Sequence, residues 1–97
     1  MMNHLFANIA YKLKDEQILI RNYQRHIPTC QQEMDLIEGT SIEIPGHGEP
    51  SLIKEIIRQY DSRNYFLKTV WKNVRDEQEI ETHCKIMRTN GWNIYQL

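Results

Sequence analysis

The stretch PSLIKEIIRQY, residues 50–60, is the most regular pattern in the chain and shapes the expected fold. Its apolar and polar residues separate onto two sides at helical spacing. The apolar side consists of Leu52, Ile53, Ile56, Ile57 and Tyr60, and the polar side of Lys54, Glu55, Arg58 and Gln59. Pro50 or Ser51 suits the start of a helix. The stretch therefore predicts an amphipathic helix with a buried apolar side.

Upstream of this stretch, residues 28–38 predict a second helix, with Thr29 as its N-cap and Gly39 just past its end. Residues 12–26 fit either a helix or two strands that turn at residues 14–17. We prefer the helix, because a four-residue turn without Gly, Pro or Asn is poor hairpin chemistry. Residues 41–44 alternate as a short strand does.

Two interpretations fit the last third of the chain. In the first, residues 65–72 and 92–97 are strands, and residues 76–89 form a helix that Asn90-Gly91 ends. In the second, residues 79–89 are a strand, and Asn90-Gly91 forms a hairpin turn. The spacing of Glu81 and Lys85 favours the helix, whereas Thr82-His83-Cys84 favours the strand.

We prefer the helix, and both interpretations predict the same fold class. The expected fold is α+β, with a short mixed or antiparallel sheet packed with two to four helices. Residues 1–97 are expected to form a single globular domain, because 97 residues supply apolar material for one thin core.

Charge and cysteine content set the expected environment. The net charge of −1 excludes a global electrostatic attraction to nucleic acid or to an anionic membrane. The N-terminus lacks the pattern of a secretory signal, and no apolar run reaches the roughly 18 residues that span a bilayer. We therefore expect a cytoplasmic protein without membrane contact. Cys30 and Cys84 are then expected to be free thiols, although their spacing does not say whether they meet.

A basic segment with interleaved aromatic residues, residues 54–75, is the candidate nucleic-acid contact. Cations beside aromatic rings fit phosphate contact combined with base stacking. The candidate residues are Arg63, Lys68, Trp71, Lys72 and Arg75. An acidic run over residues 76–81 follows directly and opposes this field.

Signals for catalysis or for a bound metal are few. The loop Gly46-His47-Gly48-Glu49-Pro50 places His47 and Glu49 before a predicted helix, where a proton carrier and a carboxylate can act together. Cys30 lies near another predicted helix start, which favours a thiolate. No ligand spacing for a metal and no cofactor motif is present, so we expect neither.

These observations favour a non-enzymatic binding domain that contacts another protein, with its own copy in a homodimer as one candidate partner. A terminal strand at the sheet edge would supply the interface residues Trp92, Ile94 and Tyr95. The competing interpretation buries Trp92 and Ile94 in the core. The alternative function is nucleic-acid binding by residues 54–75, and the third is a small enzyme that uses His47 with Glu49 or Cys30.

Overall fold

The computed structural model describes residues 2–27, 36–60 and 62–95. Seven strands and one helix follow one another along these residues. They are β1 (Met2–Lys12), β2 (Ile18–Ile27), β3 (Ser41–Ile42), β4 (Ser51–Gln59), β5 (Ser62–Leu67), β6 (Val70–Asn73), α1 (Glu77–Thr89) and β7 (Trp92–Ile94).

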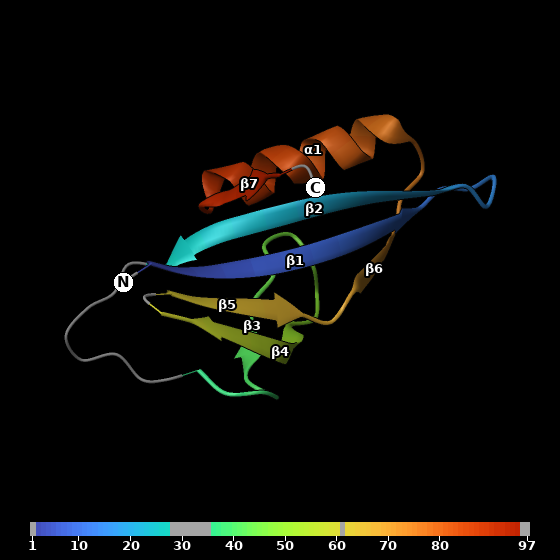
Figure 1. Ribbon diagram of the computed structural model, residues 1–97. Coiled ribbons are helices and arrows are strands. Elements are labelled where there is room, and N and C mark those ends of the chain that lie inside the picture. Colours follow the sequence, from blue (N-terminus) through green and yellow to red (C-terminus); the bar gives the residue numbers. More distant parts are fainter. Residues whose placement is uncertain (1, 28–35, 61, 96–97) are drawn as a thin grey trace.

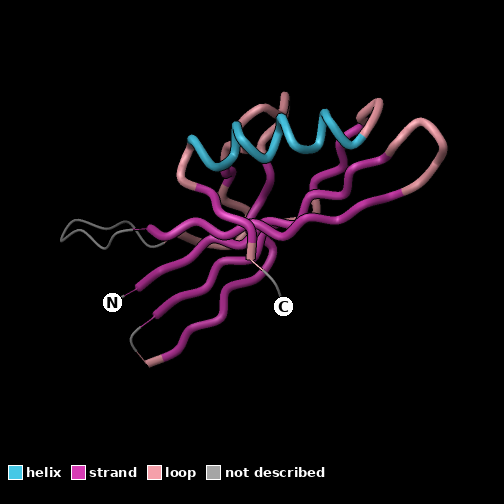
Figure 2. The backbone as a smooth tube through the Cα atoms, turned by 90° about the horizontal axis from the view of Figure 1, so that it is seen from above, coloured by secondary structure: helices cyan, strands magenta, loops and turns pink. Residues whose placement is uncertain are grey.

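The strands form one sheet in the order β3-β4-β5-β1-β2-β7. β1 lies at its centre, where it pairs antiparallel with β2 and parallel with β5 and then β6 along its two halves (Figure 1). Seen from above, the sheet is strongly twisted and α1 lies along one face (Figure 2). Strands make up 52% of the described residues and the helix 15%, so the structure is mainly β, and its sheet forms a curled half-barrel. The predicted α+β class with two to four helices is wrong.

The core lies on the inner face of this sheet, beneath α1 and the loop over residues 43–50. Alternate residues of β1 point inward and are buried, and the residues between them point to the outer face. The apolar residues of the core cluster on this face come from β1, β2, β4, β5, β6, α1, β7 and two connecting segments. They are Leu5, Ala7, Ile9, Tyr11, Tyr23, Ile44, Ile53, Tyr65, Leu67, Val70, Val74, Ile80, Cys84, Met87 and Trp92.

The helix predicted over residues 50–60 is strand β4, and a β-bulge explains the misleading pattern. The register with β5 shifts between Ile53 and Glu55, which inserts one residue into the alternation. Ile53 and Ile56 therefore both face inward although they are three residues apart, the spacing that a helix also produces. Ile57 instead faces outward and is 40% exposed.

The helix predicted over residues 12–26 is also wrong, because β2 and a three-residue turn occupy this stretch. Glu16 adopts the left-handed conformation at φ 69°, and the Asp15 carboxylate accepts from the backbone N–H of Gln17 at 3.1 Å. These two residues supply the turn chemistry that Gly or Asn usually provides. Of the helix predicted over residues 28–38, residues 28–35 lie outside the described part, and the rest leads into a turn around Gly39.

In the last third of the chain, the preferred interpretation is confirmed. Asp76 is the N-cap of α1 and accepts from the backbone N–H of Glu79 at 3.1 Å, and Gly91 at φ 90° follows the helix end. The alternative strand over residues 79–89 is wrong. The strand predicted over residues 65–72 is broken into β5 and β6, and the strand over residues 41–44 is confirmed at Ser41–Ile42.

Candidate functional site

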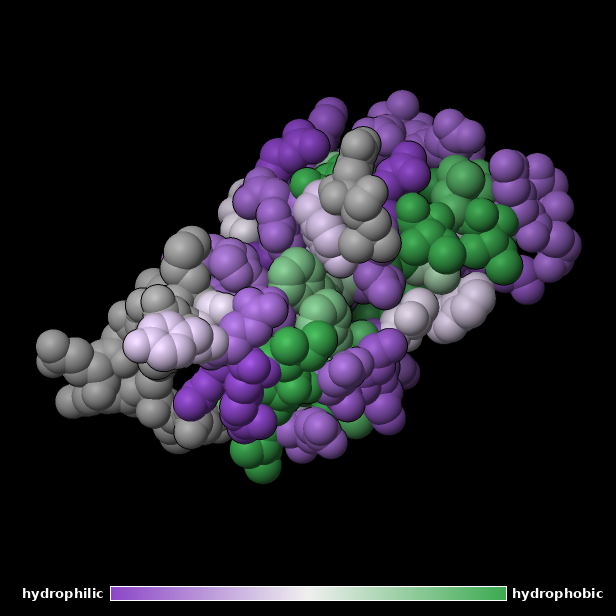
Figure 3. Space-filling view, viewed as in Figure 1, coloured by the Kyte–Doolittle hydropathy of each residue, from purple (hydrophilic) through white to green (hydrophobic). Residues whose placement is uncertain are grey.

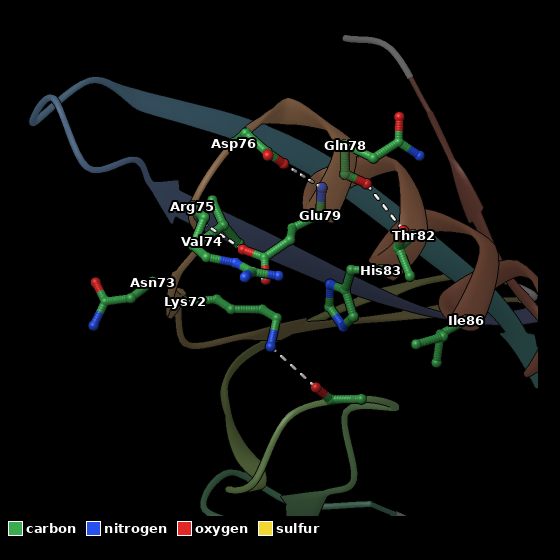
Figure 4. A pocket seen from close by; sticks show the side chains of 11 residues that line it. Lys72, Asn73, Val74, Arg75, Asp76, Gln78, Glu79, Thr82, His83 and Ile86 are labelled. Atoms are coloured by element: carbon green, nitrogen blue, oxygen red, sulfur yellow. Dashed lines mark hydrogen bonds and ion pairs between the residues drawn. The ribbon is translucent and has the colours of Figure 1, made fainter.

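A hollow of about 430 Å³ opens between the first turns of α1, the end of β6 and the loop at Gly46 (Figure 4). Polar and charged side chains supply most of its lining. The lining residues are Gly46, Lys72, Asn73, Val74, Arg75, Asp76, Gln78, Glu79, Thr82, His83 and Ile86.

The charged side chains of this hollow are engaged with nearby protein atoms. Lys72 Nζ donates to the Gly46 carbonyl oxygen at 3.2 Å, and the Arg75 guanidinium pairs with Glu79 at 3.2 Å. The backbone N–H of Arg75 also donates to the Glu79 carboxylate, and together with the guanidinium it holds the pKa of that carboxyl below its usual value. The hollow therefore offers a ligand few uncommitted charges.

A chain of buried hydrogen bonds runs from this hollow into the core. His83 Nε2 lies 2.7 Å from the Pro45 carbonyl oxygen, which can only accept, so Nε2 carries the proton. Nδ1 of the neutral ring then accepts from the Tyr11 hydroxyl at 2.7 Å. The Tyr11 oxygen in turn accepts from the Tyr23 hydroxyl at 2.8 Å. We call this set, Tyr23, Tyr11, His83 and the Pro45 carbonyl, the tyrosine–histidine chain.

Burial keeps every member of the tyrosine–histidine chain neutral. It raises the pKa of Tyr11 and of Tyr23 above their usual range. It also lowers the pKa of His83, and the nearby positive charge of Lys72 lowers that pKa further. Both ring nitrogens of His83 are already bonded within the protein. The chain therefore fastens α1 and the loop at Pro45 to the sheet, and it leaves His83 no free nitrogen for acid–base chemistry.

The lowered pKa of His83 predicts a loss of stability in acid. Above pH 6.5, the usual value of an unfolded histidine, His83 is neutral in both states. Below it, the unfolded chain binds the proton first, so the free energy of unfolding falls by at most about 1.4 kcal/mol per pH unit until the folded pKa is reached. Urea titrations between pH 7.5 and 5 should show this slope in the wild type and a smaller one in His83→Gln. Equal pH dependence of the free energy of unfolding in the wild type and in His83→Gln would contradict a lowered pKa of His83.

A second feature is an apolar surface at the end of the sheet where β1 and β2 join. In register, Ala10 lies between Ile20 of β2 and Trp71 of β6, so the three share one row on the outer face. Ile18, Ile20 and Trp71 are 46%, 59% and 60% exposed, whereas Ala10 beneath them is 1% exposed. Figure 3 shows apolar surface at this end, beside the hydrophilic tip. We call Ala10, Ile18, Ile20 and Trp71 the hairpin patch.

Beside the hairpin patch, half of β2 forms an edge of the sheet. β7 pairs only with residues 23–25 of β2, and the backbone N–H of Tyr95 donates to the Asn22 carbonyl at 3.0 Å. Backbone groups alternate in direction along a strand, so those of Ile18 and Ile20 point to the same side as those of Asn22. No strand in the described part of the chain covers them there.

The residues predicted to bind nucleic acid do not gather on one surface. Trp71 faces outward, whereas its neighbour Lys72 faces the hollow on the inner side. Arg75 is paired with Glu79, and Lys68 is exposed between β5 and β6. Arg63 is half-buried on β5, where its backbone N–H donates to Asn3.

The predicted interface residues are divided between core and surface. β7 does end the sheet, as expected of an edge strand. Trp92 nevertheless fills the core with 0% exposure, whereas Ile94 is 39% exposed. Tyr95 packs edge-on against Phe6, with ring centroids 5.2 Å apart.

The third predicted function relies on His47 with Glu49 or Cys30. His47 and Glu49 line the same hollow of about 680 Å³, apart from the one at α1, and no hydrogen bond or ion pair among the described residues joins them. Cys30 lies outside the described residues. Cys84 is a free, buried thiol in α1. No group of three or more His, Cys, Asp or Glu residues within the described ranges has the arrangement of a metal site.

The sequence interpretation missed the hairpin patch and the tyrosine–histidine chain. The alternation of Ile18 and Ile20 was the available signal for the patch, but it has meaning only if residues 18–27 form a strand. Tyr11 and His83 are 72 residues apart, so no local pattern connects them.

No protein-family model matches this chain, and comparisons with curated proteins and with solved structures give no match. The helix that the structure describes is too short and too polar to cross a membrane.

Proposed function

We propose that this chain is a non-enzymatic domain that acts through protein contact, and that its hairpin patch binds the same patch of a second copy. The observation that supports this most is the grouping of Ile18, Ile20 and Trp71. Single exposed apolar residues are ordinary on protein surfaces, but adjacent ones form the apolar areas that partners cover.

The open edge of β2 supports a second copy as the partner. If two copies pair antiparallel with Leu19 opposite Leu19, Ile18 of each lies opposite Ile20 of the other. The N–H and C=O groups of both isoleucines, which point to the open edge of β2, then form a short ladder of hydrogen bonds. This ladder stops before Asn22, whose carbonyl already accepts from the Tyr95 N–H. This register also joins the two apolar rows into one.

Charge in this region is compatible with the same register. This antiparallel register places Arg21 of each copy near the hairpin tip of the other copy, where Asp15 and Glu16 lie. Arg21 is half-buried, and its guanidinium lies 4.0 Å from the Glu81 carboxylate on α1. Because this ion pair is long, the guanidinium can also interact with a carboxylate of the second copy.

Light scattering over a range of concentrations tests the proposal. The wild type is expected to form a dimer, and Ile20→Lys a monomer with an unchanged circular dichroism spectrum, because a buried lysine without a partner opposes association. Ile57→Lys is the matched control, since Ile57 is an exposed isoleucine on the outer face of β4. It should leave the dimer intact.

A cysteine at the proposed axis tests the register. Leu19 would lie opposite its copy in a non-hydrogen-bonded pair, where the Cα atoms are about 4.5 Å apart and a disulfide can form. Mild oxidation should therefore cross-link Leu19→Cys and not the wild type. A wild type that stays monomeric at millimolar concentration would refute self-association.

A further inference from the structure

The outer face of the sheet carries a band of partly exposed aromatic rings, separate from the hairpin patch. Phe6 of β1 and Phe66 of β5 are register partners, and their rings stack with centroids 5.0 Å apart and planes at 14°. Tyr95 lies edge-on to Phe6 at 5.2 Å. His4 and His26 extend the band, with centroids 5.3 Å apart. α1 lies on the opposite face, so no helix of the described chain covers these rings.

A groove of about 240 Å³ lies directly against this band. Three of the residues that line the groove are aromatic, and most of the others have polar side chains. The lining residues are Phe6, Asn8, Lys54, Glu55, Phe66, Leu67 and Tyr95. The Asn8 amide can both donate and accept hydrogen bonds, and the Glu55 carboxylate accepts from amino groups. A flat, heteroaromatic ligand with a polar rim matches this combination.

The outer face of the sheet has few acidic residues, so little negative charge would repel a polyanion there. Alternation and register place one carboxylate, Glu55, among the described outer-face residues of the sheet. Asp76, Glu77, Glu79 and Glu81 all belong to α1 or its cap on the other face. Lys54 lines the groove, and Lys68 is exposed just after β5. A near-neutral net charge of −1 thus conceals a face with few carboxylates.

We propose that this groove binds a base of a single-stranded nucleic acid. The base stacks on the rings of Phe6, Phe66 and Tyr95, and its polar edge meets Asn8 and Glu55. The flanking phosphates run toward Lys54 and Lys68. A single strand is required because the bases of a duplex are already stacked and paired, and are not available to rings on an open sheet.

Fluorescence anisotropy with labelled 12-nucleotide single strands of mixed sequence, RNA and DNA in separate arms, tests this at low salt. Phe66→Leu keeps an apolar side chain but removes the ring, so it should weaken binding about 5- to 150-fold. Tyr60→Leu removes a fully exposed ring that does not line the groove, and it should leave the affinity unchanged. Lys54→Gln should reduce the dependence of binding on salt.

Three outcomes would overturn the proposal. The first is absence of wild-type binding to both single strands at 20 mM salt. The second is equal affinity of Phe66→Leu and wild type, which would indicate a surface for another class of partner, such as a peptide. The third is equal affinity for a duplex of the same sequence. Circular dichroism of each variant shows that a loss of binding is not a loss of fold.

Discussion

Replacement of Trp92 by alanine is expected to lower the free energy of unfolding by about 3–5 kcal/mol. Trp92 is completely buried in β7, directly after the turn that ends α1, and it belongs to the main core cluster. Its removal leaves a cavity where the helix and the sheet meet. Because the free energy of unfolding of small domains is only about 5–15 kcal/mol, a large fraction of the variant molecules should be unfolded.

The second tryptophan of this chain supplies the matched control. Trp71→Ala makes the same substitution at a side chain that is 60% exposed. At protein concentrations too low for self-association, surface changes of this kind alter stability by about 0.5 kcal/mol or less. Urea titrations followed by circular dichroism compare the two variants. If Trp92→Ala costs no more than Trp71→Ala, Trp92 is not a core residue.

Trp92→Phe refines this test, because the indole Nε1 is buried without a hydrogen-bond partner in the described part of the chain. An unsatisfied buried donor carries a desolvation cost of about 1–3 kcal/mol. Phenylalanine removes that donor and keeps most of the apolar contact. Its cost should therefore be well below that of alanine.

Gly46→Ala is expected to destabilise the protein by about 2–5 kcal/mol, from two separable effects. Gly46 has φ 71°, a conformation that costs an L-residue about 1–2 kcal/mol. A Cβ there would also lie 2.9 Å from Cδ2 of the His83 ring and 3.3 Å from Ile86. The hydrogen bonds to Pro45 and Tyr11 hold that ring at both nitrogens, so relieving the overlap adds about 1–3 kcal/mol.

Gly39→Ala isolates the first of these effects. Gly39 has φ 88°, but a Cβ there would meet no atom within 4 Å. The free energy of unfolding of this variant should therefore fall only by the cost of the positive φ. In the double variant Gly46→Ala/His83→Ala, the extra cost of Gly46→Ala should largely disappear, because the ring it overlaps is gone. Equal destabilisation by Gly46→Ala and Gly39→Ala in urea titrations would contradict this contact.

The fate of two stretches shows how far local sequence could predict the fold. The helix over residues 76–89 was predictable because its signals act locally: Asp76 caps its own helix, and Gly91 adopts the positive φ that ends it. In residues 50–60, the bulge after Ile53 gives a strand the apolar spacing of a helix. Periodicity alone cannot separate these two cases, because the pairing with β5 that creates the bulge is not local.

The candidate sites depended even more on distant contacts. The residues of the tyrosine–histidine chain come from β1, β2, α1 and the loop at Pro45. The aromatic groove joins Phe6, Phe66 and Tyr95, which lie at the two ends and in the middle of the chain. Of the predicted basic segment, residues 54–75, it includes Lys54, Glu55, Phe66 and Leu67. The tripeptide Thr82-His83-Cys84 gave no sign that its histidine is a buried structural residue.

The sequence by itself determined the chain's overall charge, the helix α1 with its caps, and the terminal strand that follows it. These depend on composition and on bonds between residues a few positions apart. Tertiary structure decided that strands β2 and β4 form where helices over residues 12–26 and 50–60 were predicted, that Trp92 is buried while Trp71 is exposed, and which rings meet on the outer face. The physical reason is that strands gain their hydrogen bonds and buried area from partners far along the chain, whereas a helix satisfies its backbone within itself.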